Sequence, residues 1–352
     1  MGILALALTL QAAGQVFDMG TTADRLVVLE AESGTAVNSA TDTWTLVNAG
    51  TTPAAPTTPS SFGGTGAMVC LADNGGGNDN ATGFVNGPRL NFRVLFRQAG
   101  TYYVWVRGRA YDNTAATPSQ PPGNNDSCHV ALDGVAAATG FRVSGYAATD
   151  WDWSRTREGG NISITAGSVG VHTFSVVMRE DGFMVDRVII TANANYAGVT
   201  QGGAMIGPAA TGQIPDQTPA AATAPFVVPG SFRFDVSWSP VANADTYILE
   251  RGLNGGTFAP VFTGAGLTYS EENFDTANDY CFRVRGVDAV FGAGPVSLPS
   301  CGRSQLPPPR TGGHEEGFLD ENCACGSTAL QVPAPAWLAG LPLLALFRRR
   351  RR

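Results

Sequence analysis

The chain of 352 residues has little charge: only 14% of its residues are charged, and its formal net charge is −7. Its one basic run is Arg348–Arg352, at the end of the chain. Proteins that bind nucleic acids need a basic face that displaces counterions from the phosphates. The sequence therefore argues against nucleic acid as a partner.

Motifs of catalysis are also missing. Neither GxSxG nor HExxH occurs, and no set of Ser, His and Asp has assignable roles. The three histidines (His129, His172 and His314) have no metal-ligand spacing with one another. The glycine-rich loop at Gly75–Gly77 is not followed by a helix start, so it is no phosphate cradle. These absences predict a protein that is not an enzyme.

Turn-forming residues are abundant, with 44 Gly and 22 Pro. Such a composition is typical of secreted all-β modules with short strands. Over residues 24–195, Arg89–Arg97 alternates cleanly, with Leu90, Phe92, Val94 and Phe96 on one face. Gly100–Arg109 is apolar on both faces, which predicts a central strand. About nine such short strands indicate an N-terminal jelly-roll β-sandwich.

Three acids stand out at the two ends of this predicted domain. In Arg179–Thr191, alternation places Asp186 on the same face as Val188 and Ile190, which would bury its carboxylate. Near the start, Glu30 and Glu32 share a face with Val28. Three carboxylates that converge from the first and last strands suit Ca²⁺, which prefers oxygen ligands. Alternatively, the acids lie on solvated faces or pair with Arg179 or Arg187.

The same segments carry a family resemblance. Val28–Glu32, Gly100–Arg107 and the hairpin from Gly170 to Arg187 resemble the EAE strand, the GxYxxWVR strand and the closing hairpin of calcium-containing jelly-roll carbohydrate-binding modules. These are the modules of the family-six and family-thirty-five type, and the C-terminal sandwich of some xylan glucuronidases is similar. The resemblance implies that Glu30, Glu32 and Asp186 bind a structural calcium ion.

A candidate ligand-binding loop lies at 145–157. It places Tyr146, Trp151 and Trp153 among polar residues. Exposed aromatic rings stack on the apolar faces of sugars, and nearby polar groups, here Asn125 and Asp126, bind the hydroxyls. The alternative is that the tryptophans fold back as a lid on the core.

Residues 225–303 form a second all-β unit. Phe232, Phe234, Val236 and Trp238 alternate with polar residues. The string from Trp238 to Tyr247 resembles strands B and C of a fibronectin type III domain, which has an immunoglobulin-like fold. The segment that begins at Tyr280 resembles its strand F. Trp238 and Tyr280 are expected to be core residues.

The six cysteines occur as local pairs. Cys70 and Cys128 fall within the first predicted domain, and Cys281 and Cys301 fall within the second. In an exported protein both pairs are plausible disulfides. Cys323 and Cys325 lie in the C-terminal segment.

Four segments lie outside the two predicted domains. Residues 1–15 are typical of a signal peptide, with a buried strand as the alternative. Residues 196–224 are expected to be a linker without periodicity, and 304–322 a spacer. Residues 323–352 resemble a MYXO-CTERM sorting signal: Cys-x-Cys-Gly, an uncharged stretch and five arginines. The resemblance implies cell-surface anchoring and a sortase-like processing protease that acts near Cys323 or Cys325. An ordinary transmembrane anchor is the alternative.

The sequence as a whole predicts an exported, non-catalytic protein that is anchored in a membrane through its C-terminal segment. Its N-terminal module would bind polysaccharide, with the fibronectin-like unit as a spacer. Two other hypotheses remain open: an adhesion or matrix protein that makes protein contacts, and an accessory part of a glycoside-degrading system.

Overall fold

A computed structural model describes residues 14–51, 54–77, 87–110, 125–137, 142–146, 149–157 and 160–308. In these ranges the regular structure is β-strand, apart from the 3₁₀ turn η1 (Ala31–Ser33), and there is no α-helix. The predicted all-β fold class is therefore confirmed. The described ranges contain no helix that is long and apolar enough to span a membrane.

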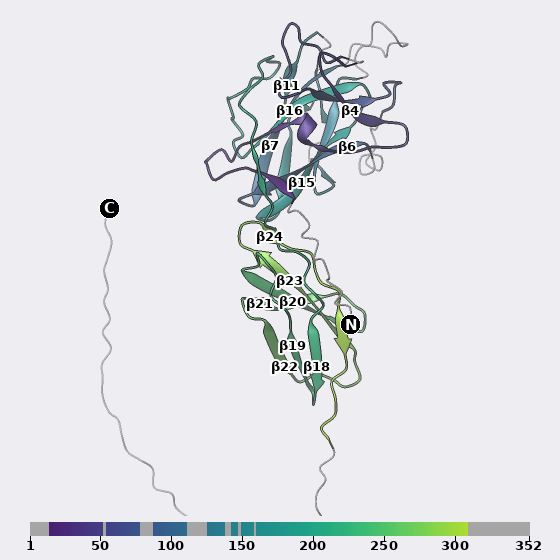
Figure 1. The fold of residues 1–352 in the computed structure, drawn as a ribbon, viewed down its shortest axis with the longest axis vertical. Helices are drawn as coiled ribbons and strands as arrows, with labels where there is room; N and C mark the ends of the chain where they lie inside the picture. The colour runs from purple at the N-terminus through teal and green to yellow at the C-terminus, as the bar shows by residue number, and fades with distance from the viewer. Residues whose placement is uncertain are drawn as a thin grey trace, which may run out of the picture. The chain divides into compact units, whose positions relative to one another are not determined.

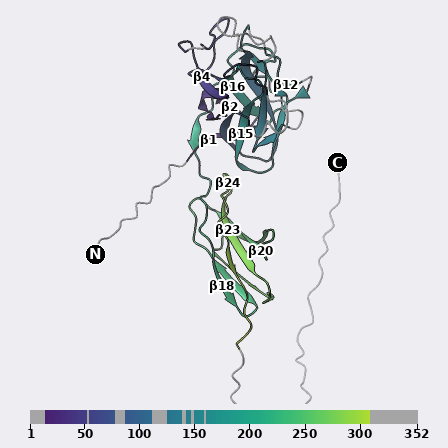
Figure 2. The same cartoon turned by 90° about the vertical axis from the view of Figure 1, so that its right-hand side faces the viewer.

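The first sheet of the N-terminal sandwich has the order β10-β8-β15-β6-β1-β17, with β3 and β9 attached to β6 and β8 (Figures 1 and 2). Its strands are β1 (Gln15–Asp18), β3 (Thr35–Val37), β6 (Arg89–Phe96), β8 (Cys128–Leu132), β9 (Val135–Ala136), β10 (Arg142–Val143), β15 (Gly170–Met178) and β17 (Gln213–Pro215).

The second sheet has the order β11-β7-β16-β5-β4, with β14 paired to β7 and β2 to β16 (Figure 1). Its strands are β2 (Val27–Glu30), β4 (Thr43–Val47), β5 (Ala67–Leu71), β7 (Gly100–Ala110), β11 (Asp152–Ser154), β14 (Ser163–Ala166) and β16 (Phe183–Thr191). A short ribbon of β12 (Thr156–Arg157) and β13 (Gly160–Asn161) follows β11.

The main core lies between the two sheets. Leu90, Phe92, Val94 and Phe96 of β6 all belong to it, which confirms the alternation predicted for this strand. Cys70 and Cys128 also belong to this core, and both are free. The prediction of a Cys70–Cys128 disulfide is therefore wrong in this structure. Burial raises the pKa of both thiols, so they pack as small apolar groups.

Strand β16 departs from simple alternation at a bulge. Its pairing with β7 shifts register between Val185 and Arg187. Val185 and Val188 consequently both face the main core, whereas Met184 and Ile189 belong to clusters on the outer side of the sheet. A bulge adds one residue to a strand and redirects its side chains. Here the bulge turns Asp186 towards Arg107 of β7.

Two segments without long strands cover the outer face of the second sheet. Residues 54–66 pack over Trp151 and Met184, and residues 193–208, which we call the strap, pack over Trp105 and Trp153. Backbone carbonyls of the strap accept hydrogen bonds from Arg107 (at Ala204) and Trp153 (at Met205). Residues 196–224 thus contain most of the strap and all of β17, instead of being a linker throughout.

The second sandwich consists of a three-stranded and a five-stranded sheet (Figure 1). The first contains β18 (Phe226–Gly230), β19 (Arg233–Ser237) and β22 (Thr268–Glu272). The second contains β20 (Thr246–Leu253), β21 (Ala259–Gly264), β23 (Tyr280–Asp288), β24 (Gly292–Ala293) and β25 (Ser300–Gly302). Trp238 is buried in the core between them, as predicted, and Tyr280 packs against that core partly buried.

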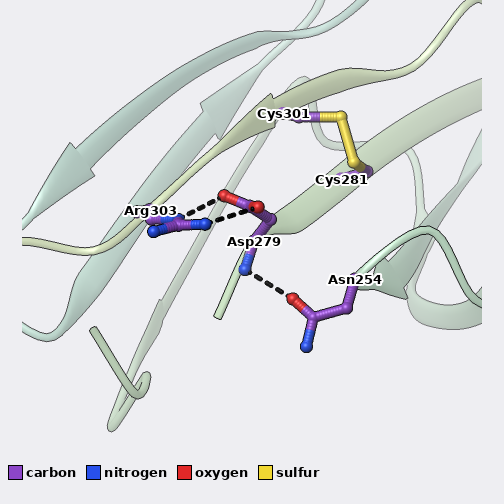
Figure 3. The surroundings of a disulfide bond; sticks show 5 residues. All are labelled: Asn254, Asp279, Cys281, Cys301 and Arg303. Atoms are coloured by element: carbon purple, nitrogen blue, oxygen red, sulfur yellow. Dashed lines mark hydrogen bonds and ion pairs between the residues drawn. A yellow bond between two sulfur atoms is a disulfide. The ribbon is translucent and has the colours of Figure 1, made fainter. Parts of the chain in front are cut away.

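Cys281 and Cys301 form a disulfide between directly opposed positions of β23 and β25 (Figure 3). Beside it, Arg303 binds Asp279 through two hydrogen bonds of 2.5 and 2.9 Å, and Asn254 accepts from the Asp279 N–H at 2.8 Å. The predicted pairing of Cys281 with Cys301 agrees with this structure. A disulfide is compatible with an extracellular protein.

Candidate functional site

The rings of Tyr146, Trp151 and Trp153 are buried, with at most 5% of each residue exposed. Tyr146 lies between the sheets and donates from its hydroxyl to the Val106 carbonyl at 2.9 Å. The indole N–H groups of Trp151 and Trp153 donate to the carbonyls of Pro56 (2.9 Å) and Met205 (2.7 Å). The prediction that these rings are exposed is therefore wrong, because the covering segments enclose the two indoles.

The polar residues predicted to accompany them lie at the start of β8. Asn125 is buried, and the Asp126 N–H donates to Glu180 Oε2 at 2.9 Å. Ser127 Oγ donates to the same carboxylate oxygen at 2.8 Å, and Arg179 pairs with the other. Burial and the neighbouring Glu180 carboxylate raise the pKa of Asp126 to about 6. These groups form a hydrogen-bonded cluster at the beginning of the strand.

The acids predicted to bind calcium lie near one another, but each has other partners. Glu30 pairs with Arg187 across the β2–β16 ladder, and Asp186 accepts from Arg107 at 2.5 Å and from the Gly63 N–H at 2.7 Å. Asp186 and Arg107 are fully buried as a pair. Desolvation raises the pKa of Asp186 to about 6, and the Glu30 charge adds to this effect.

Further observations bear on whether these acids fit a calcium ion. Glu32 accepts from the Thr65 N–H at 2.7 Å through Oε1, and its buried Oε2 has no hydrogen-bond partner in the described part of the chain. Both glutamates border Gly64, which adopts a φ of +54°; a Cβ there would lie 3.1 Å from the Glu30 carboxyl carbon. However, the described residues hold no group of three or more His, Cys, Asp or Glu arranged for a metal. The unpartnered Glu32 Oε2 favours a bound cation. Arg187 and Arg107, however, already neutralise Glu30 and Asp186.

A hollow on the outer face of the first sheet was not predicted from the sequence. This sheet hollow has a volume of about 290 Å³. It is lined by Arg89, Asn91, Ala131, Asp133, Gly134, Thr173, Ser175 and Val177. Register explains why these residues share one face: Ser175 lies opposite both Asn91 and Ala131, and Val177 lies opposite Arg89. The alternation of Arg89–Arg97, which places Asn91 on the face opposite Leu90 and Phe92, is the sequence signal that could have indicated this site.

Hydrogen bonds orient the polar groups of the sheet hollow. Ser175 donates to Asn91 Oδ1 at 2.8 Å, which leaves the Asn91 NH₂ group directed elsewhere and without an acceptor in the described residues. Asp133 accepts from the Thr173 N–H at 2.8 Å and contacts His172 Nδ1 at 2.6 Å. Val177 and Ala131 supply an apolar floor. The hollow can therefore hold a polyhydroxylated ligand by hydrogen bonds, and none of the described residues that line it is aromatic.

The remaining predicted residues are not placed. Cys323 and Cys325, and with them the whole segment 323–352, lie outside the described residues, as do residues 1–13 of the expected signal peptide. Gln15, at its expected end, begins β1.

Comparison with known proteins gives similarities of limited extent. No family model matches the chain. The uncharacterized protein P23 of Formosa agariphila is 30% identical over 122 residues, which cover 32% of this chain; the chain spans only 27% of the length of this curated relative.

Solved structures with similar folds include two kinds of β-sandwich. The sixth fibronectin type III domain of human fibronectin type III domain containing protein 3 is 26% identical, with a TM-score of 0.24, and covers 26% of this chain and 89% of that one. The Podospora anserina GH26-CBM35 β-(1,4)-mannanase is 12% identical, with a TM-score of 0.31, and covers 49% of this chain and 28% of that one. These similarities concern the all-β sandwich fold.

Proposed function

We propose that this is a non-catalytic extracellular protein whose N-terminal sandwich binds polysaccharide, with the sheet hollow as the binding surface. The observation that carries the proposal is the hollow itself, where oriented hydrogen-bonding groups surround an apolar floor on the outer face of the first sheet. Sugars offer the matching combination of hydroxyls and apolar C–H faces. The resemblance of the Val28–Glu32 and Gly100–Arg107 segments to carbohydrate-binding modules supports the same function.

The remaining parts of the proposal follow from the sequence. Glu32, whose buried Oε2 has no partner in the described part of the chain, would hold a structural calcium ion together with Glu30 and Asp186, and the ion would supply positive charge between the first and last strands of the sandwich. The second sandwich is a spacer, and residues 323–352 direct the protein to the cell surface. The Cys281–Cys301 disulfide supports this location, because disulfides persist in oxidising compartments.

Binding of the full chain to insoluble xylan, mannan and cellulose tests the proposal. Asn91→Ala combined with Thr173→Ala removes two hydrogen-bonding side chains from the sheet hollow. Neither residue belongs to the apolar core, although Ser175 loses its hydrogen bond to Asn91, so the melting temperature of the variant is measured as well. We expect the variant to bind the polysaccharide at least about 5-fold more weakly than the wild type does, because two hydrogen bonds contribute roughly 1–3 kcal/mol. Thr43→Ala, which alters an exposed residue of the second sheet, is the control and should bind as the wild type does. Equal binding by all three proteins would exclude the sheet hollow.

Protein adhesion is a second candidate, favoured by the apolar side chains that the second sandwich exposes. Phe226 is 70% exposed and Val228, on the same face of β18, is 43% exposed. Leu298 and Leu306 are also exposed. In this alternative, these side chains contact another protein, and the sheet hollow has no ligand. An accessory role beside a separate glycoside-degrading enzyme requires the same polysaccharide binding as the first proposal.

A further inference from the structure

A second hollow, of about 470 Å³, lies under the strap on the outer face of the second sheet. Its floor is Trp105 of β7, and its walls include Arg155 and Asn161 near the β12–β13 ribbon and Asn195, Tyr196 and Gln201 of the strap. We call it the strap pocket. Its volume is within the range of small-molecule sites, about 300–1,000 Å³. It faces away from the sheet hollow, since each of the two lies on the outer face of a different sheet.

Hydrogen bonds hold the walls of the strap pocket in place. The strap pairs with β11 through Gly202 N–H to Trp153 O (2.8 Å) and Trp153 N–H to Gly203 O (3.2 Å). Gln201 accepts from the Arg155 N–H at 3.2 Å and donates to Ser154 Oγ at 3.0 Å, and both hydrogen bonds hold the wall in position. The pocket is therefore formed before any ligand arrives.

The floor carries a hydrogen-bond donor that folding leaves unused. Trp105 is only 3% exposed, and its indole N–H has no acceptor among the described residues. The Arg155 guanidinium lies 4.5 Å from the centre of the ring and donates to the Ala194 carbonyl at 2.6 Å. A buried donor without an acceptor is costly unless a ligand or water provides one.

The rim supplies further uncommitted groups. The side-chain amides of Asn161 and Asn195 and the hydroxyl of Tyr196 make no hydrogen bond with any described residue, and both asparagines are exposed. Each amide is at once a donor and an acceptor, which matches adjacent sugar hydroxyls. Tyr196, which is partly exposed, adds aromatic surface for C–H groups. Arg155 is the only charged side chain among the described lining residues, so these residues offer a metal cation no carboxylate, imidazole or thiolate ligand.

We infer that the strap pocket is a second saccharide site, which takes one unit of a neutral glycan. It does not require the sheet hollow to bind. With both sites filled, one sandwich holds two glycan segments on opposite faces and cross-links them.

Calorimetric titration of the full chain tests this inference separately from the proposed function. The starting protein carries Asn91→Ala and Thr173→Ala, so that the sheet hollow is disabled, and the probes are tetrasaccharides of xylose, mannose, glucose and galactose. We expect one of them to bind. Adding Asn161→Ala and Asn195→Ala should weaken that binding at least 10-fold at unchanged melting temperature, because both side chains are exposed and make no internal bonds.

Two further variants, one inside the strap pocket and one outside it, test where the saccharide binds. Trp105→Phe keeps an aromatic floor but removes the N–H, and should weaken binding several-fold; Gln217→Ala alters an exposed amide outside the pocket and should change nothing. The inference is overturned if no tetrasaccharide binds the protein with the disabled sheet hollow, or if binding persists after Asn161 and Asn195 are replaced. If wild type and the protein with the disabled sheet hollow bind equally, the proposed function has the wrong site while the inference stands.

Discussion

Asp126 lies beside the Glu180 carboxylate and keeps its proton to unusually high pH. Burial and the Glu180 charge raise the pKa of Asp126 to about 6. Because the folded protein binds this proton more tightly than the unfolded chain does, the resulting stability is fully present below about pH 4 and is lost as pH rises through 6. Asp126→Asn keeps a hydrogen-bond donor at every pH. We expect its melting temperature to match the wild type at pH 4 and to exceed it at pH 8.

The opposite dependence of stability on pH is expected for Asp279 of the second sandwich. Hydrogen bonds from Arg303 lower the pKa of Asp279. Asp279→Asn should therefore be less stable than the wild type near neutral pH and equally stable once the pH has fallen well below about 4. The difference in stability should be small, because the pair with Arg303 is exposed. For the first of these two predictions, identical pH profiles of the Asp126→Asn variant and the wild type would rule out the raised pKa of Asp126.

Replacing Glu32 tests calcium binding without breaking an ion pair between a carboxylate and an arginine. Replacing Asp186 would strand the buried Arg107, which destabilises the fold with or without metal. Glu32 pairs with no arginine in the described residues, so Glu32→Gln should change stability little in chelator. With calcium at about 100 times its dissociation constant, we expect the wild type to gain about 2.7 kcal/mol and the variant to gain much less. Differential scanning calorimetry with and without calcium measures both, and an equal shift in the two proteins would place the ion elsewhere.

At the scale of elements, the strap is part of the sandwich. A fragment of residues 14–195, which stops at the boundary expected from the sequence, loses the cover of Trp105 and Trp153 and the carbonyl acceptors of Arg107. A fragment of residues 14–224 keeps them. Exposing two large rings costs at least about 4 kcal/mol, so the shorter fragment should melt at least about 8 °C lower. Thermal unfolding followed by tryptophan fluorescence compares the two, and equal midpoints would show that the strap adds no stability.

The strap is a part of the fold that could not be predicted from the sequence. The strand at Arg89–Arg97 was predicted correctly because its alternation reports directly which side chains face the core. The strap instead provides backbone carbonyls, at Ala204 and Met205, and every residue type carries a carbonyl. The β16 bulge could not be predicted either, since Phe183–Thr191 carries apolar residues on both faces. Simple alternation therefore placed Asp186 on the face of Val188 and Ile190, whereas the bulge turns it towards Arg107. The predicted ligand-binding loop was wrong for the same reason, because the covering segments bury its two tryptophans. The hollow is formed instead by polar residues on the outer face of the first sheet.

At the scale of the whole molecule, the two candidate functions assign the second sandwich different roles. If it is a spacer, all contacts with polysaccharide come from the first sandwich. Residues 14–224 alone should then bind the retained polysaccharide with a dissociation constant within about twofold of the full chain, a difference of about 0.4 kcal/mol or less. Affinity electrophoresis in gels that contain the polysaccharide measures both values under one condition.

Replacing the exposed apolar residues distinguishes the spacer role from the adhesive one. Phe226 and Val228 lie on β18, at the edge of the three-stranded sheet, where a partner protein would reach them. Phe226→Ser with Val228→Ser should leave polysaccharide binding unchanged, because singly exposed apolar side chains are normal on protein surfaces. A loss of binding in this variant, with the melting temperature of the second sandwich preserved, would mean that this face contacts the ligand. The spacer role would then be wrong, and a binding surface that extends over both sandwiches would replace it.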